Sequence, residues 1–176
     1  FLQVFDEAVR AQYPGLSVPD GVLGFGSWVG GDMDGNPNVG ADTIDETLRA
    51  QRALVLERYQ RECAQLGRLL SQTDDRVEVS AALRKRLDDY RQRLPEAAAA
   101  IRPRHHNMPY RCLLTLMDAR LAATENDDEG GYVNADGFAG DVALIVDSLL
   151  ENKGENAGLF AVKRLQWRVR TFGFHL

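Results

Sequence analysis

The sequence predicts a mainly α-helical chain that carries one or two β-strands of a larger fold. Apolar residues recur at steps of three or four over most of residues 43–170, which is the spacing of an amphipathic helix. Only an apolar run at residues 22–29 and a second run that begins at Phe172 are typical of strands. Two strands separated by a long helical interval cannot close a sheet, so we expect the missing strands in a longer chain.

The first forty residues are expected to form a helix, a strand and a glycine-rich loop. Residues 1–11 place apolar side chains on one helical face, and the Tyr-Pro-Gly sequence at 13–15 ends that helix. Residues 22–29 are small and apolar without polar alternation, as in a strand that is buried on both faces. The loop at 30–38 is rich in glycine, aspartate and asparagine, which permit abrupt changes of backbone direction.

The long helical region is expected to begin with a helix from Thr43 to about Ser71. Thr43 and Glu46 have the spacing of a capping box at its start. A second apolar stripe ends near Pro95, which can end or restart a helix. The residues expected on these two stripes are Ile44, Leu48, Val55, Tyr59, Cys63, Leu66, Leu70, Leu83, Leu87, Tyr90 and Leu94.

Three further helices are expected after an irregular segment at 101–108. Pro109 suits the first turn of one helix, with Asn107 as its possible cap. A charged, solvated loop at 126–131 separates this helix from the next, and Asn156 is the expected cap of the last one. The stripes comprise Leu113, Leu114, Met117, Leu121, Phe138, Val142, Ile145, Leu149, Leu159, Val162, Leu165 and Val169.

The composition is that of an ordinary soluble domain. The 176 residues are 44% hydrophobic, and no apolar run approaches the roughly 20 residues that cross a bilayer, so we expect no membrane partner. A formal net charge of -5 argues against a nucleic-acid partner, which would require a basic face. Cys63 and Cys112 lie in helical patterns without metal-ligand spacing, so we expect buried thiols and a cytoplasmic location.

Two groups of residues invite a metal-site interpretation. The alternating oxygen side chains of residues 32–36 begin like a calcium loop, but Pro37 and Thr43 stand where that loop needs glycine and glutamate. We therefore expect the aspartates to hydrogen-bond backbone amides of the loop, and a calcium-binding helical protein stays a weaker alternative. His105 and His106 lack further ligands at suitable spacing, which favours solvated loop residues.

The stretch at 25–38 resembles the signature F-x-S-W-x-G-G-D-R-D-G-N-P of phosphoenolpyruvate carboxylase, with Met33 in place of the arginine. The resemblance runs from near Phe1 to Leu176 and implies an interior segment, residues 1–176, of a bacterial-type enzyme. It implies a helix-elaborated β/α barrel, with the strand and loop at 22–38 on the working face and a helical region at 43–170. That enzyme forms oxaloacetate and phosphate from phosphoenolpyruvate and bicarbonate.

The resemblance also implies roles for single residues. Trp28 would line the apolar wall of the pocket where carbon dioxide and the enolate meet, whereas burial in the core is the alternative. Arg111, in a Pro-Tyr-Arg motif, would belong to a site that binds a sugar-phosphate activator in plant forms, whereas an exposed first-turn arginine is the alternative. The residues implied at the substrate pocket are Trp28, Gly30, Gly31, Asp32, Asp34 and Asn36.

The catalytic set is expected outside this segment. The family's histidine lies in a Thr-Ala-His-Pro-Thr motif that this chain lacks, and the carboxylates that hold magnesium or manganese are also missing. No lysine, arginine or histidine lies between Arg10 and Arg49, so cations that face an anionic substrate must come from elsewhere. We expect a homotetrameric full-length enzyme and an inactive fragment. The alternative from another class is a non-catalytic helical interaction module.

Overall fold

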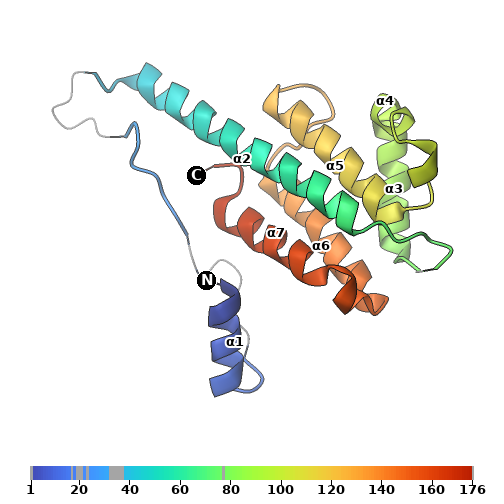
Figure 1. Cartoon of the computed structure of the whole chain (residues 1–176). Helices are drawn as coiled ribbons and strands as arrows, with labels where there is room; N and C mark the ends of the chain where they lie inside the picture. Colours follow the sequence, from blue (N-terminus) through green and yellow to red (C-terminus); the bar gives the residue numbers. More distant parts are fainter. Residues whose placement is uncertain are drawn as a thin grey trace.

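The computed structural model describes residues 2–16, 18, 22, 24–31, 38–76 and 78–175, and its regular secondary structure in those ranges is helical (Figure 1). The α-helices are α1 (Leu2–Gln12), α2 (Ala41–Leu69), α3 (Ala81–Arg93), α4 (Pro95–Ala99), α5 (Pro109–Glu125), α6 (Ala135–Glu151) and α7 (Leu159–Phe172). Two 3-10 helices, η1 (Pro103–His105) and η2 (Gly154–Ala157), lie between them. The predicted mainly α class is therefore confirmed for the described residues.

A bundle of α2, α5, α6 and α7 forms the body of the molecule, with α3 and α4 beside α5 (Figure 1). The most extensive packing joins α2 to α5, followed by α6 against α7. The first buried residue of α2 is Val55, so the N-terminal half of this helix extends beyond the bundle. That position explains why Leu48, expected on the buried stripe, is 51% exposed.

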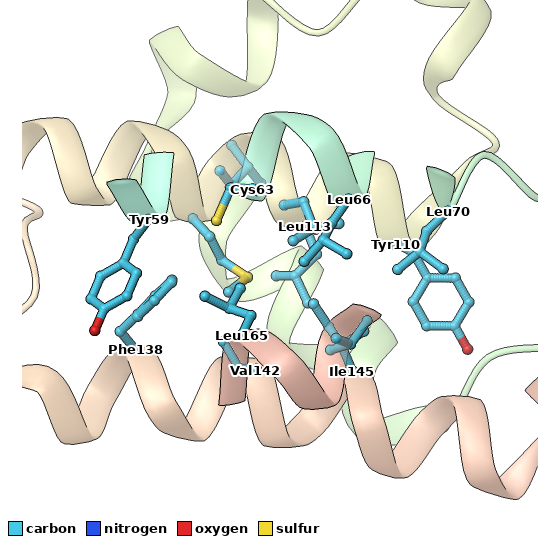
Figure 2. Close-up of a cluster of buried hydrophobic side chains, with 14 of the residues drawn as sticks. Tyr59, Cys63, Leu66, Leu70, Tyr110, Leu113, Phe138, Val142, Ile145 and Leu165 are labelled. Atoms are coloured by element: carbon cyan, nitrogen blue, oxygen red, sulfur yellow. The ribbon is translucent and has the colours of Figure 1, made fainter. Parts of the chain in front are cut away.

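The core lies where α2 and α5 face α6 and α7. Figure 2 shows Tyr59, Cys63 and Leu66 of α2 pointing toward Val142 and Ile145 of α6, with side chains of α5 and α7 filling the space between. Each of these apolar side chains contributes about 1.5–3 kcal/mol on burial, which exceeds any helix propensity term. Both cysteines are buried free thiols, as expected, and burial raises the pKa of the Cys63 thiol well above its ordinary value.

The expected caps at Thr43 and Asn107 are wrong. Gly40 is the N-cap of α2, and Thr43 lies inside the helix, where its hydroxyl donates to the carbonyl of Asn38 at 3.1 Å. Met108 precedes α5 as N-cap without a side-chain hydrogen bond. The Asn107 amide donates to Asp75 at 3.3 Å instead, because the 70–80 connection passes beside it.

The expected cap at Asn156 is also wrong. Asn156 lies within η2, and Gly158 precedes α7 with φ 109°, a left-handed conformation that favours glycine. Leu69 and Leu70 lie about 3 Å from the position of a Cβ at Gly158, so space also requires glycine here. The C-terminal end of α2 therefore dictates this turn.

Neither expected strand is present in the described residues. Residues 22 and 24–28 have no regular secondary structure, Val29 lies in a turn, and all of them are exposed, because no described strand supplies partners for their N–H and C=O groups. Phe172 ends α7 rather than beginning a strand, and Gly173 follows with φ 57°. The chain then turns back so that Phe174 joins an aromatic cluster with Tyr59 and Phe138. The larger barrel remains a prediction.

Among the described residues, none of the helices has the length and apolar character that crossing a membrane requires.

Candidate functional site

The two ends of the glycine-rich loop lie against the start of α2. Gly30 adopts φ 74°, and a Cβ at this position would lie 2.3 Å from the hydroxyl of Thr47. The other end is held by the hydrogen bond from Thr43 to Asn38. Gly31 closes a turn by donating its N–H to the carbonyl of Trp28 at 3.1 Å. Only glycine combines this conformation with so close an approach to the helix.

The three polar residues expected at the substrate pocket, Asp32, Asp34 and Asn36, lie outside the described residues, as does Met33. Of the others, Trp28 is 77% exposed and Gly31 is exposed. Trp28 is therefore not part of the core of this chain. Nearby, Phe25 stacks on Phe172 of α7 with ring centroids 5.4 Å apart, which brings the loop region to the C-terminal end of α7.

A polar pocket of about 330 Å³ opens between α2, α5 and the connection at 100–105. Arg111 projects from the first turn of α5 across α2, so that its Cγ lies 3.7 Å from the position of a Cβ at Gly67. Arg68 of α2 and Arg102 of the connection also line the pocket. Pro109 at the start of α5 fixes the direction of this turn. Three arginines from three segments therefore line one cavity.

These arginines carry positive charge that the described part of the chain leaves uncompensated. Elsewhere, arginines such as Arg58 and Arg168 pair with a carboxylate, here Glu62. No ion pair within the described ranges involves Arg68, Arg102 or Arg111. A cavity with several unpaired guanidinium groups suits an anion, because guanidinium donates two parallel hydrogen bonds to phosphate or carboxylate.

One carboxylate, that of Asp118, lies at the pocket, one helical turn beyond Thr115 on α5. Burial raises its pKa, and no arginine contributes to the shift. Within the described ranges, no ion pair joins Asp118 to an arginine of the pocket.

The two adjacent histidines lie in different surroundings. His105 lines the pocket, and its Nε2 accepts a hydrogen bond of 3.2 Å from Nε of Arg104. Partial burial lowers the pKa of His105, and the charges of Arg111, Arg104, Arg102 and His106 lower it further. His106 is exposed, with Nε2 3.0 Å from the carbonyl of Ile101. The prediction of two solvated loop histidines thus describes His106, whereas His105 is half-buried at a pocket.

A second polar cluster lies inside the bundle, around the fully buried carboxylate of Asp141 on α6. Tyr90 and Tyr132 donate their hydroxyl groups to it at 2.5 and 2.7 Å. Arg86 forms an ion pair with it, and Arg120 lies 4.0 Å away. Every oxygen of this carboxylate has a partner, so the cluster binds α3, α5 and α6 together and leaves no open position for a ligand.

No group of three histidine, cysteine or acidic residues in the described ranges has an arrangement that could hold a metal ion.

A family model of phosphoenolpyruvate carboxylase matches residues 1–176, the whole of this sequence. The chain belongs to the phosphoenolpyruvate carboxylase family. The resemblance of residues 25–38 to the signature of this family is thus confirmed.

Curated phosphoenolpyruvate carboxylases support the same assignment. The sequence is 55% identical to the enzyme of Xanthomonas euvesicatoria pv. vesicatoria and 53% identical to that of Xanthomonas oryzae pv. oryzae, over 99% of this chain and 19% of each relative. It is 33% identical to the enzyme of Burkholderia mallei over 97% of this chain and 18% of that protein. The chain therefore spans about a fifth of the length of the phosphoenolpyruvate carboxylases it matches.

Sequence reasoning identified Arg111 but missed Arg68, Arg102 and His105. Arg102 and His105 belong to a run that is rich in basic residues, from 102 to 111, and this clustering is a signal that could have been used. Arg68 lies far away in sequence and reaches the pocket only because α2 packs along α5. No local pattern in this segment of a phosphoenolpyruvate carboxylase predicts that contact.

Proposed function

We propose that this chain is an interior part of a phosphoenolpyruvate carboxylase that forms oxaloacetate and phosphate from phosphoenolpyruvate and bicarbonate. The match of the family model across residues 1–176 carries the proposal. In the full-length protein, magnesium or manganese would polarise the enolate, and its ligands would come from other parts of the chain. We further propose a cytoplasmic homotetramer for the complete enzyme.

The isolated segment is expected to be inactive, because its described residues hold no metal-binding group and it lacks the Thr-Ala-His-Pro-Thr motif. The test compares the purified 176-residue chain with the full-length protein in a coupled assay for oxaloacetate, with magnesium, phosphoenolpyruvate and bicarbonate. Turnover by the full-length protein alone supports the proposal. Turnover by the segment would contradict the proposal that the catalytic residues lie outside it. Inactivity of the full-length protein would contradict the assigned reaction.

The loop that follows Trp28 is proposed to shape the substrate pocket of the full-length enzyme. Its ends are held by Gly30 against Thr47 and by Asn38 against Thr43, so α2 supplies a rigid support on both sides. An exposed indole ring beside this supported loop is available to the remainder of the fold. Such a ring would exclude water from a reactive enolate.

The pocket between α2 and α5 is proposed to bind an anionic effector, with Arg111 as its central ligand. A cavity of about 330 Å³ lies within the range of small-molecule sites, roughly 300–1,000 Å³. Arg68, Arg102 and Arg111 supply guanidinium donors without a described carboxylate partner. The similarity of Arg111 to the activator-site arginine of plant forms points to a sugar phosphate.

The effector site is tested by Arg111→Ala in the full-length protein, with rates measured at subsaturating phosphoenolpyruvate with and without a hexose phosphate. We expect activation of the unaltered protein and its loss in the variant. Arg61→Ala is the matched control, because Arg61 is an exposed arginine of α2 that pairs with Glu57 away from the pocket. Equal activation of Arg111→Ala and the unaltered protein would contradict the proposal.

A further inference from the structure

We propose that His105 couples anion binding in the pocket between α2 and α5 to proton uptake, so that anion affinity increases as pH falls. The proposal rests on the effector site proposed above and adds its regulation. His105 lies on the wall of the cavity that Arg68, Arg102 and Arg111 line. An imidazolium at this position would become a fourth cationic donor to the same anion.

The hydrogen bond between Arg104 and His105 defines the state of the empty pocket. Nε of Arg104 always carries hydrogen and is the donor, so Nε2 of His105 is the unprotonated nitrogen and the ring is neutral. Protonation of Nε2 by solvent requires that Arg104 give up this bond. Arg104 is exposed and can turn into water. The imidazolium Nε2–H then donates to water until an anion enters the pocket and takes its place.

The charges around His105 decide in which direction binding moves its protonation. Arg68 faces it from α2, Arg102 and Arg104 from the connection and η1, and Arg111 from α5. Partial burial, together with the charges of Arg111, Arg104, Arg102 and His106, keeps the pKa of His105 below its ordinary value in the empty pocket. Asp118, the acidic residue that lines the pocket in the described part of the chain, forms no ion pair with these cations. A bound dianion offsets the arginine charges and raises the pKa of His105.

The shift in the pKa of His105 fixes the direction in which pH changes anion affinity. Between the lower pKa of the empty pocket and the higher pKa of the occupied pocket, the complex binds protons to a greater extent than the free protein. Affinity therefore increases as pH falls through the pKa of the complex and levels off below the pKa of the free protein. One added charge-assisted hydrogen bond in a half-open site corresponds to about a three- to tenfold change in the dissociation constant.

The test uses the full-length protein and sulfate, which stays a dianion throughout the titration, whereas a phosphate monoester gains a proton near pH 6 and would obscure the result. Calorimetric titrations are made between about pH 5.5 and 8, in buffers of different ionisation enthalpy. The contribution of the pocket is the binding that Arg111→Ala removes. We expect this component to tighten about three- to tenfold with falling pH and to take up at most about half a proton near the midpoint of this change.

Three variants separate the proposal from its rivals. His105→Gln should keep sulfate binding at pH 8 and lose both the pH dependence and the proton uptake. His105→Lys should bind tightly across the range, because its charge does not titrate there. His106→Gln is the matched control and should behave like the unaltered protein, since its ring faces the Ile101 carbonyl instead of the pocket.

Each remaining outcome is decisive. If Arg111→Ala removes no sulfate binding, the effector site itself is wrong. If it removes binding but His105→Gln retains the pH dependence, the site stands and the coupling through His105 is wrong. A pH dependence that Asp118→Asn abolishes would assign the proton to that carboxylate and equally overturn the proposal.

Discussion

Trp28 is a large aromatic residue that the described part of the chain leaves 77% exposed. An indole ring gains much by burial, so its exposure after an apolar run is unusual unless another part of the protein covers it. Trp28 is not part of the core of the described residues, so a substitution can test its proposed role at the substrate pocket without disturbing core packing.

Replacement of Trp28 tests that role in the full-length enzyme. Trp28→Phe is expected to leave the melting temperature nearly unchanged but to lower bicarbonate-dependent turnover and divert the enolate to pyruvate, because the smaller ring admits water. Oxaloacetate and pyruvate are measured in parallel coupled assays. Phe25→Leu, at the stack with Phe172, is the control for a general disturbance of this segment. Unaltered kinetics of Trp28→Phe, together with a loss of about 3–5 kcal/mol of unfolding free energy in Trp28→Ala, would show that Trp28 acts in the core instead.

Asp118 allows a test of pH-dependent stability at the same scale. Burial raises its pKa in the folded state above the unfolded value, so the folded state holds its proton more tightly. Its charged form therefore lowers stability above the folded pKa, and this cost disappears as pH falls below both values. Asp118→Asn is expected to raise the melting temperature by about 1–2 °C at neutral pH.

The advantage of Asp118→Asn should shrink steadily as the pH approaches about 4, the unfolded pKa of an aspartate. Thermal unfolding followed by circular dichroism at several pH values measures it. Asp88→Asn, an exposed aspartate on α3 paired with Arg91, is the comparison. A destabilised Asp118→Asn at neutral pH would mean that the carboxylate has a stabilising partner.

At the scale of the elements, helix positions follow the apolar stripes, whereas helix starts follow neighbouring segments. Asn134 caps α6 by accepting a hydrogen bond from the N–H of Gly137 at 3.3 Å. Asn107 has a comparable sequence context before α5, but its side chain reaches Asp75. Two asparagines before two helices therefore have different roles.

This difference predicts unequal effects of the same substitution. Asn134→Ala is expected to cost about 1 kcal/mol of unfolding free energy, because an N–H at the start of α6 loses its acceptor. Asn107→Ala should cost less than about 0.5 kcal/mol, since it removes only an exposed hydrogen bond. Urea unfolding of both variants measures the difference. Equal costs would show that Asn107 caps α5 in solution after all.

At the scale of the whole molecule, buried polar clusters join helices that are distant in sequence. Asp141 connects α6 to Tyr90 of α3 and to Tyr132 in the connection before α6. Arg120 of α5 donates to the hydroxyl of Tyr90 and to the carbonyls of Gly130 and Gly131, at 2.9 Å in both carbonyl bonds. The acidic loop and three helices therefore share one hydrogen-bonded network.

Loss of the Asp141 charge should weaken the entire bundle. Asp141→Asn is expected to cost on the order of 3–5 kcal/mol of unfolding free energy, because Arg86 and Arg120 lose their buried counter-charge. Asp88→Asn removes an exposed ion pair and should cost no more than about 1 kcal/mol. Urea midpoints at neutral pH compare the two. Similar small costs would show that the network contributes no more than a surface pair.

The sequence by itself determined the family, the helical regions and the buried stripes. The signature at 25–38 contains rarely combined residues, and the helical period of apolar residues is a local pattern. Both can therefore be recognised in the sequence without the tertiary structure. The sequence also indicated Arg111, through the Pro-Tyr-Arg motif that resembles the family.

Tertiary structure alone decided the caps, the absence of the expected strands from the described residues, and the makeup of the pocket. A strand needs partners for its backbone hydrogen bonds, and a run of apolar residues does not supply them. The pocket brings Arg68 beside Arg111 and His105 because α2 packs along α5. Such contacts depend on how helices distant in sequence approach one another, and no local pattern encodes that approach.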